Sequence, residues 1–425
     1  MLEPENNPNP PSVVDPPRAL RFVLARYLSR IANTRQIAKR RARFEKKRLA
    51  DKCDQEVEYF HQFDDPYSHL TAQALARFAA RYDVKIMPHL VHASGGKNQP
   101  EQDKLAVWAR RDAGLIAPHY GLSFPDGVGV APGQAAQRAA ANALANLDAE
   151  GFIRDIAGIS TAMWLDDMPP QPGKTSEASA EERLDRGSAR LAELGHYSGA
   201  TFFYGGEWYW GVDRLFLLEQ RLRDLGACKA PEEPYIVPRP SIDVSGVDAS
   251  GLDLHFFPSL NSPYTAIIYD RTIELARACQ VNLHHKPVLP MVMRGVPVTR
   301  AKTEYIMFDT KREADFFGVP FGPLVVPIGT PTRNAYSLLP WARELGKDCE
   351  LLSALLRLAW AEGKGLHRRS NMRRAVEEAG LDWSEAVTQL GSDDWKTPVE
   401  KNQDEMIEGM GLWGVPSYKL SGPSG

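Results

Sequence analysis

Apolar residues recur in the same order in two parts of the chain, 56–91 and 253–288, at a constant offset of 197 residues and without a gap. Each part opens with an alternating apolar stretch, which is typical of a strand. A Pro-Tyr-Ser or Pro-Tyr-Thr triplet then begins a segment with helical spacing, since proline is favoured as the first helical residue. Second strand-like runs follow at 84–91 and 281–288. Strand, helix, strand predicts a parallel βαβ unit in each part.

Long helical stretches follow this unit in both parts. They are predicted at 102–111, 135–147 and 180–194 in the first, and at 304–317, 335–345, 350–362, 372–379 and 399–410 in the second. Strand-like sequence returns at 201–204 and 208–210, before a helix at 211–225, and again at 417–420. We therefore expect an α/β fold in which two similar domains each carry a helical insertion.

Proline-rich segments set the expected domain boundaries. Residues 1–17 are too rich in Pro and Asn for regular structure and are expected to form a disordered tail. A basic helix is predicted at 18–52, a first domain at 53–226, a linker at 227–251 and a second domain at 252–425. A shorter break at 169–179 is expected to be a loop within the first domain.

Composition excludes several classes of protein. The formal charge of -3 and a pI near 6.4 give no global attraction to nucleic acid. The four cysteines lie far apart and form no CxxC pair, at Cys53, Cys228, Cys279 and Cys349. This pattern argues against a redox dithiol, a zinc knuckle or a disulfide framework, so no metal is expected. With no apolar run of transmembrane length and no signal-like N-terminus, we expect a soluble cytoplasmic protein.

The segment 18–52 differs in charge from the rest of the chain. Thirteen Lys or Arg residues stand there against two acids, Glu45 and Asp51, and apolar residues gather in its first half. One interpretation is a helix that binds a membrane surface or a protein partner. The other is a solvated helix that packs on its own domain or on a second subunit. The sequence leaves both open, and also leaves the oligomeric state open.

Several motifs resemble the DsbA-like thioredoxin superfamily, and within it the 2-hydroxychromene-2-carboxylate isomerases and kappa-class glutathione transferases. The second part reads Phe256-Phe257 followed by Ser262-Pro263-Tyr264-Thr265, where redox members of the superfamily carry Cys-x-x-Cys. The segments around Arg294 and Lys302 are similar to later family motifs, and 414–418, Gly-Val-Pro-Ser-Tyr, resembles the cis-proline loop. The resemblance implies two tandem thioredoxin-like domains, over roughly 54–225 and 252–420.

The first part departs from the family pattern at its active centre. Asp65 stands where the isomerases have serine, and Ala200 stands where the cis-proline is expected. This implies a degenerate site, although Asp213 and Arg214 lie in a Trp-Gly-x-Asp-Arg motif that the family uses to help hold glutathione. The second part keeps the serine and proline but stops before an equivalent terminal strand and helix. A native end and a shortened chain look the same in sequence.

The resemblance implies glutathione as cofactor and Ser262 as the catalytic residue. A helix N-terminus favours an anion, so a hydroxyl there would donate to the glutathione thiolate and lower its pKa. Val415 and Pro416 would pair with the extended tripeptide. Arg294 and Lys302 are candidates for the carboxylates of glutathione or of an aromatic acid substrate.

Two functions remain open at this point. One is a glutathione-dependent isomerase or transferase acting on a small molecule. The alternative is a catalytically degenerate thioredoxin-fold protein that serves binding or scaffolding. A serine before proline is also an ordinary N-cap, so Ser262 alone does not separate them.

Overall fold

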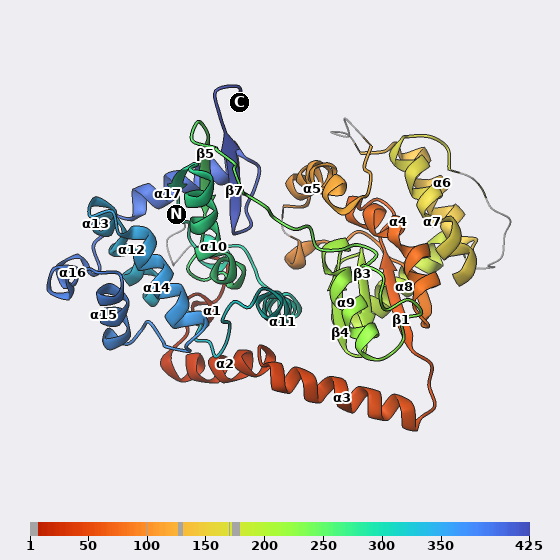
Figure 1. Ribbon diagram of the computed structural model, residues 1–425, viewed down its shortest axis with the longest axis horizontal. Coiled ribbons are helices and arrows are strands. Elements are labelled where there is room, and N and C mark those ends of the chain that lie inside the picture. The colour runs from red at the N-terminus through yellow and green to blue at the C-terminus, as the bar shows by residue number, and fades with distance from the viewer. Residues whose placement is uncertain (1–6, 100, 126–130, 170, 172–178) are drawn as a thin grey trace. The chain divides into compact units, whose positions relative to one another are not determined.

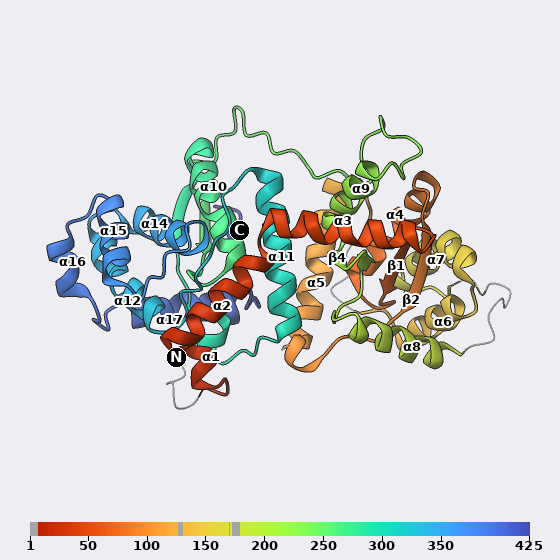
Figure 2. The same cartoon turned by 90° about the horizontal axis from the view of Figure 1, so that it is seen from below.

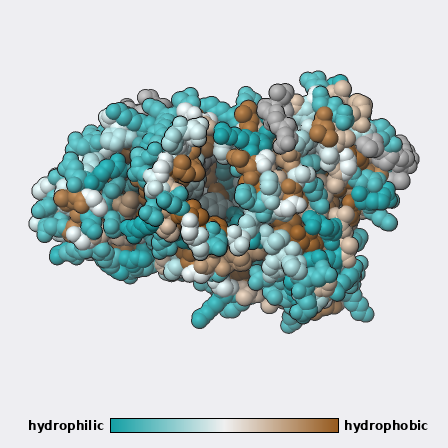
Figure 3. Space-filling model, turned by 45° about the horizontal axis from the view of Figure 1, so that its top comes forward, coloured by the Kyte–Doolittle hydropathy of each residue, from teal (hydrophilic) through white to brown (hydrophobic). Residues whose placement is uncertain are grey.

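The computed structural model describes residues 7–99, 101–125, 131–169, 171 and 179–425 (Figure 1). The chain divides into two compact units. Unit 1 comprises Met1–Lys39 and Asp243–Gly425, and unit 2 comprises Arg40–Ile242. Each unit has its own sheet and its own hydrophobic core. On the face drawn in Figure 3, hydrophilic residues predominate and hydrophobic residues occur in small groups.

Unit 2 is built on a four-stranded sheet in the order β2-β1-β3-β4. Strands β1 (Glu56–His61) and β2 (Lys85–Leu90) are parallel and are joined by helix α4 (Pro66–Arg81). Strands β3 (Thr201–Tyr204) and β4 (Glu207–Trp210) form an antiparallel hairpin beside β1. Gly205 and Gly206 both have positive φ, which a two-residue hairpin turn requires.

Helices cover the sheet of unit 2 (Figures 1 and 2). Between β2 and β3 lie α5 (Gln102–Ile116), α6 (Gln134–Ala145), α7 (Ala149–Trp164) and α8 (Ala180–Glu193), with 3₁₀ turns η2 (Gly96–Asn98) and η3 (Ala117–Tyr120). Helix α9 (Val212–Asp224) follows β4. Helix α7 packs against α4, and α8 packs against β2. The insertion therefore packs on both α4 and the edge strand β2.

Unit 1 has a three-stranded sheet in the order β6-β5-β7. Parallel strands β5 (Asp253–Phe257) and β6 (Asn282–His285) are joined by α10 (Pro263–Cys279), and β7 (Ser417–Ser421) lies antiparallel to β5. The expected strand at 281–288 ends early because Pro287 cannot donate a ladder hydrogen bond. The core of unit 1 is formed mainly by helices packed on this sheet.

The insertion of unit 1 is longer than that of unit 2. Its elements are η4 (Met291–Arg294), α11 (Arg300–Phe317), α12 (Thr330–Ser337), α13 (Leu339–Glu344), α14 (Asp348–Trp360), α15 (Arg369–Glu378), α16 (Trp383–Gln389), α17 (Lys396–Asp404) and the π-helical turn η5 (Glu405–Gly409). The helix expected at 335–345 is divided between α12 and α13. Pro340 explains the break, because it lacks the N–H that a continuous helix needs.

The two βαβ units have the same register. Glu56 pairs with Lys85 in unit 2, and Asp253 pairs with Asn282 in unit 1, 197 residues later at both positions. The strand pairs thus follow the offset found in the sequence.

The N-terminal region differs from the expectation. Residues 1–6 lie outside the described residues, but 7–17 are ordered against unit 1, so the prediction of a disordered tail is wrong for them. Asn7 and Asn9 donate to the carbonyl of Val292 at 2.9 and 3.1 Å, and the short helix α1 (Pro11–Val14) buries Val14. Two side chains of the expected tail are therefore fixed by a backbone acceptor about 285 residues away in the chain.

The basic segment 18–52 forms two helices instead of one, α2 (Arg18–Ile31) and α3 (Thr34–Ala50). The break lies at Asn33, whose Oδ1 accepts from the N–H of Gln36 at 3.0 Å and so starts a new helix. Leu28 is buried in the core of unit 1, so the face of α2 that carries Leu28 packs on its own domain, as one of the two interpretations expected.

The expected linker also differs in part. Residues 227–237 pack on unit 2, where the N–H of Ile236 donates to both carboxylate oxygens of Glu219 at 3.0 and 3.1 Å and Val237 is fully buried. The boundary between the units lies after Ile242. The loop expected at 169–179 falls largely outside the described residues. In the part of the chain that is described, no helix combines the length and apolar character needed to cross a bilayer.

Candidate functional site

The turn between β5 and α10 positions Ser262 at a helix start. Ser262 is the N-cap of α10, with extended backbone angles (φ -104, ψ 120), and Pro263 is the first helical residue. The Ser262 Oγ accepts the N–H of Thr265 at 3.2 Å. Local sequence explains this geometry, because a serine cap followed by proline satisfies one N–H and removes another. The side chain of Ser262 is buried at the positive end of a 17-residue helix.

The loop before β7 faces this turn. The Ser262 hydroxyl donates to the carbonyl of Val415 at 3.2 Å, and the peptide bond between Val415 and Pro416 is cis. The two segments meet because β5 and β7 are neighbours, with Phe257 paired to Ser417. The sequence places Ser262 and Val415 153 residues apart, and the sheet brings them into hydrogen-bond contact.

Two buried aromatic residues hold the turn in place. The Tyr336 hydroxyl accepts the N–H of Leu260 at 3.2 Å and donates to the carbonyl of Val288 at 2.8 Å. The indole of Trp360 donates to the carbonyl of Leu260 at 2.9 Å. Both backbone groups of Leu260 are therefore satisfied inside the core, two residues before Ser262. Tyr336 and Trp360 belong to no recognisable motif, so sequence reasoning missed them.

The two cations predicted to bind carboxylates both contact Trp413. Arg294 donates to the carbonyl of Trp413 at 2.7 Å and to that of Leu289 at 3.0 Å. Lys302, in the first turn of α11, lies with its ammonium 5.1 Å from the centroid of the Trp413 ring. Burial lowers the pKa of Arg294 to about 10 and also lowers the pKa of Lys302. In this structure both side chains hold the loop that carries Val415.

A polar atom and an apolar cluster border Ser262 and Val415. The Oδ1 of Asn261 is buried and accepts no hydrogen bond from a described residue. Val415 packs on a small cluster centred on Phe257, Val288 and Met406. An unsatisfied acceptor therefore lies next to Ser262, and only the outer members of the apolar cluster, Val415 among them, are partly exposed.

The remaining predicted residues lie in unit 2. Asp213 and Arg214 begin α9 and bind each other, with 2.5 Å between the Arg214 Nη1 and the Asp213 Oδ2. They are not part of the group around Ser262 in unit 1, and their expected role in holding glutathione stays a prediction. At the start of α4, Asp65 caps the helix through the N–H of Ser68 at 2.8 Å. Burial raises the pKa of Asp65 to about 6, although the bonds from Ser68 lower it.

The comparison with protein families identifies the fold of one region. Residues 253–423 match the family model of the DSBA-like thioredoxin domain. This segment is a DsbA-like domain. It contains β5, α10, β6 and β7, the serine turn and the Val415 loop. No curated protein sequence matches the chain.

Solved structures similar to the chain include a 2-hydroxychromene-2-carboxylate isomerase, with 18% identity and a TM-score of 0.35, over 40% of this chain and 85% of that one. A probable DsbA oxidoreductase from Streptomyces coelicolor has 16% identity and a TM-score of 0.32, over 40% and 80% of the two chains. The cytosolic disulfide reductase DsbM from Pseudomonas aeruginosa has 16% identity and a TM-score of 0.31, over 40% and 87%.

Proposed function

We propose that the DsbA-like domain binds glutathione with its sulfur at the N-terminus of α10 and acts as a glutathione-dependent isomerase or transferase. One observation carries the proposal. The Ser262 hydroxyl caps α10 and at the same time donates to the carbonyl that precedes Pro416. A serine in that place cannot form a disulfide, and none of the four cysteines lies in the turn. The site is therefore suited to a thiol that comes from outside the chain.

The Ser262 hydroxyl has one hydrogen, so it can donate only one hydrogen bond at a time. In this structure it donates that hydrogen to the Val415 carbonyl. Rotation of the hydroxyl toward a bound thiolate would release that carbonyl to accept an N–H of an extended peptide. The first-turn N–H groups and the helix dipole favour an anion at this point by about 0.3–1 kcal/mol. Bound glutathione would supply the nucleophilic thiolate, and the protein would hold it deprotonated.

The residues present fit a tripeptide at this place. Asn261 carries a buried Oδ1 that no described residue satisfies, and buried acceptors of this kind normally have a partner. An amide N–H of glutathione would provide one. Around the buried Phe257, the partly exposed side chains of Val415, Leu412 and Met410 would offer an apolar surface to an aromatic acid substrate.

We further propose that unit 2 is a second, degenerate copy of the same thioredoxin-like fold. The register of the antiparallel strand pairs supports this proposal. Phe257 pairs with Ser417 in unit 1, and Phe60 pairs with Thr201 in unit 2, so Ala200 occupies the place of Pro416. Asp65 caps α4 as Ser262 caps α10. A carboxylate in place of the hydroxyl would repel a thiolate, which makes unit 2 unsuited to thiol activation.

Calorimetric titration of the full chain with glutathione tests the proposal. We expect binding in the wild type, weaker binding in Ser262→Ala, and unchanged binding in Asp65→Ala, which alters the matching cap of unit 2. The absence of heat at millimolar glutathione, or equal affinities of wild type and Ser262→Ala, overturns it. A second variant, Ser262→Cys, reports on the helix terminus directly. Its thiolate absorbance at 240 nm, measured against the wild type, should titrate well below the ordinary thiol pKa of about 8.5.

One observation favours the alternative, a binding or scaffolding protein. Arg294 and Lys302, the expected carboxylate ligands, are both engaged with Trp413. If glutathione does not bind, the contacts of Arg294 and Lys302 with Trp413 serve only to stabilise the loop. The domain would then function through its surface, by binding a partner.

A further inference from the structure

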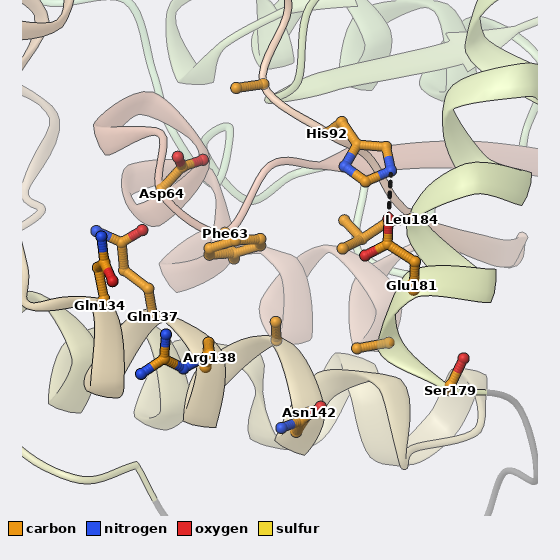
Figure 4. A pocket seen from close by; sticks show the side chains of 13 residues that line it. Phe63, Asp64, His92, Gln134, Gln137, Arg138, Asn142, Ser179, Glu181 and Leu184 are labelled. Atoms are coloured by element: carbon orange, nitrogen blue, oxygen red, sulfur yellow. Dashed lines mark ion pairs between the residues drawn. The ribbon is translucent and has the colours of Figure 1, made fainter.

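Unit 2 contains a cavity of about 690 Å³ at the ends of its parallel strands (Figure 4). Phe63 and Asp64 follow β1, and His92 and Ala93 follow β2. Helices α6 and α8 complete the walls. The lining residues are Phe63, Asp64, His92, Ala93, Gln134, Gln137, Arg138, Ala141, Asn142, Ser179, Ala180, Glu181 and Leu184. Small-molecule sites have volumes of roughly 300–1,000 Å³, so this cavity is of a size that holds one.

Three side chains that can ligate a metal ion lie together beside this cavity, and two of them, His92 and Glu181, line it. Glu181 and Asp185 are four residues apart on α8 and so share one face of the helix. The His92 Nε2 lies 2.9 Å from the Asp185 Oδ1 and 4.0 Å from the Glu181 Oε1. All three ligand atoms lie within 4.8 Å of one another. Two ligands of a tetrahedral zinc ion, each about 2.0–2.1 Å from the metal, are roughly 3.3 Å apart, so small side-chain rotations would close the set around an ion.

The backbone holds these side chains in position. The N–H of His92 donates to the Ser188 Oγ at 3.0 Å, which anchors the histidine to the helix that carries both carboxylates. A reciprocal pair of bonds between Ser179 and Glu182 fixes the start of the same helix. The imidazole is 41% exposed, and the carboxylates of Glu181 and Asp185 are 76% and 68% exposed. Protein ligands would therefore occupy one side of an ion, and its other positions would stay open.

The opposite wall of the cavity carries a cation. Arg138 on α6 forms no hydrogen bond or ion pair that the described residues provide, and it lies beside Gln137. In Figure 4 the side chain of Phe63 lies between Arg138 on one side and the pair formed by His92 and Glu181 on the other. Phe63 and Leu184 make the floor apolar. A ligand with an apolar body and a carboxylate matches this arrangement, because guanidinium pairs strongly with carboxylate.

We propose that His92, Glu181 and Asp185 bind a divalent transition metal, Zn²⁺ by preference, and that the metal and Arg138 together hold a small carboxylate anion in the cavity. One imidazole and two carboxylates suit zinc, and three protein ligands with an open position are typical of zinc sites that bind a further molecule. The site is independent of Ser262 and of glutathione.

Zinc binding to the full chain tests the metal site. The chain, freed of metal with a chelator, is titrated with Zn²⁺ in competition with a chromophoric chelator, and its circular dichroism is recorded to verify folding. We expect one equivalent to bind, and affinity to fall about tenfold or more in His92→Gln and in Asp185→Asn. The control is His284→Gln, because His284 and Asp253 form a similar exposed pair, 2.6 Å apart, without the second carboxylate. Equal zinc affinity in wild type, His92→Gln and Asp185→Asn overturns the site.

Co²⁺ tests which residues are the metal ligands, and benzoate tests the anion site at Arg138. Co²⁺ at this site should show visible bands without the strong thiolate charge-transfer absorption near the ultraviolet, because no cysteine is a ligand; that absorption in the wild type would contradict the assignment. Benzoate should bind the zinc-loaded wild type and bind more weakly to Arg138→Gln and to His92→Gln. Unchanged benzoate affinity in both variants overturns the anion site.

Discussion

Tyr67 donates its hydroxyl hydrogen to the Oδ2 of Asp112 at 2.8 Å. The same pair recurs 197 residues later, where Tyr264 donates to the Oδ2 of Asp309 at 2.9 Å. Each pair joins the helix of a βαβ unit to the first long helix of the insertion, α4 to α5 and α10 to α11. The offset of the sequence repeat thus continues beyond its last strand, into the side chains that attach the insertion to the helix of the βαβ unit.

Replacement of Tyr67 by phenylalanine should destabilise the protein. Burial raises the pKa of Asp112, and the hydroxyl of Tyr67 is the donor that offsets this effect. Loss of a donor to a buried carboxylate costs about 1–3 kcal/mol, which urea unfolding at pH 7 can measure. Tyr235→Phe is the control, because its hydroxyl donates no hydrogen bond to a described residue. Equal loss in the two variants would show that Tyr67 acts through packing alone.

The Asp65 carboxyl should make stability depend on pH. Burial raises its pKa from 3.8 to about 6, so the folded state binds a proton more tightly than the unfolded state. The free energy of unfolding should therefore fall as pH rises from about 4 to 6. An asparagine side chain would still cap the helix without carrying a charge, so Asp65→Asn should be more stable than the wild type by about 1–3 kcal/mol at pH 7.5. Urea unfolding across pH 4 to 7.5 should show this advantage vanish in acid.

Asp382 provides a control of opposite sign. It caps α16, and hydrogen bonds from Ser384 and Glu385 lower its pKa. Its contribution is present at neutral pH and is lost as pH falls below the unfolded value. Asp382→Asn should therefore be less stable than the wild type at pH 7.5. A pH profile with the same sign for both variants would exclude the buried carboxyl of Asp65 as the cause.

Arg294 should affect glutathione through the position of the Trp413 loop. Its guanidinium donates to the carbonyls of Leu289 and Trp413, so Arg294→Met would leave two acceptors unsatisfied and would release the loop that precedes Val415. We expect the affinities for glutathione and for its diethyl ester to fall by a similar factor, and Arg294→Lys to recover part of the loss. A fall confined to the free acid would instead show that Arg294 binds a glutathione carboxylate directly.

The sequence predicted elements whose signals are local. Alternating apolar residues and a Ser-Pro or Asp-Pro start located β1, β5, α4 and α10, and the hairpin strand at 201–204 was predicted with the bounds that the structure has. Helix α7 (Ala149–Trp164) was missed because two glycines and several β-branched residues give it low intrinsic propensity. Packing against α4 stabilises it instead. Such tertiary support cannot be read from a single segment.

The candidate site was predicted in part for the same reason. Ser262 and Pro416 belong to recognisable motifs, whereas Tyr336 and Trp360 support the turn from helices 76 and 100 residues beyond Leu260. The group formed by His92, Glu181 and Asp185 was also missed. Nothing in the spacing of a histidine after a strand and two acids about 90 residues later indicates that they meet.

The basic helix α2 leads to the last prediction, which concerns a membrane surface. Its inner face is fixed, with Leu28 buried in the core of unit 1 and the Ser29 hydroxyl bonded to the backbone of Leu324. Its outer face carries Phe22 and Val23, 62% and 60% exposed. The exposed arginines on this face are Arg18, Arg26 and Arg30. Apolar residues between cations fit the interface of an anionic bilayer.

We expect the chain to float with vesicles that contain phosphatidylserine and to stay in solution with pure phosphatidylcholine. Binding should weaken with added salt, because the Debye length shortens from about 10 Å at 0.1 M to about 3 Å at 1 M. Phe22→Ser with Val23→Ser should reduce binding, since each apolar side chain buried contributes about 1.5–3 kcal/mol. Ile242→Ser, which removes an apolar side chain of similar exposure elsewhere, should leave it unchanged. If vesicle binding is unchanged by the double substitution and by high salt, this face of α2 is not the membrane-binding surface.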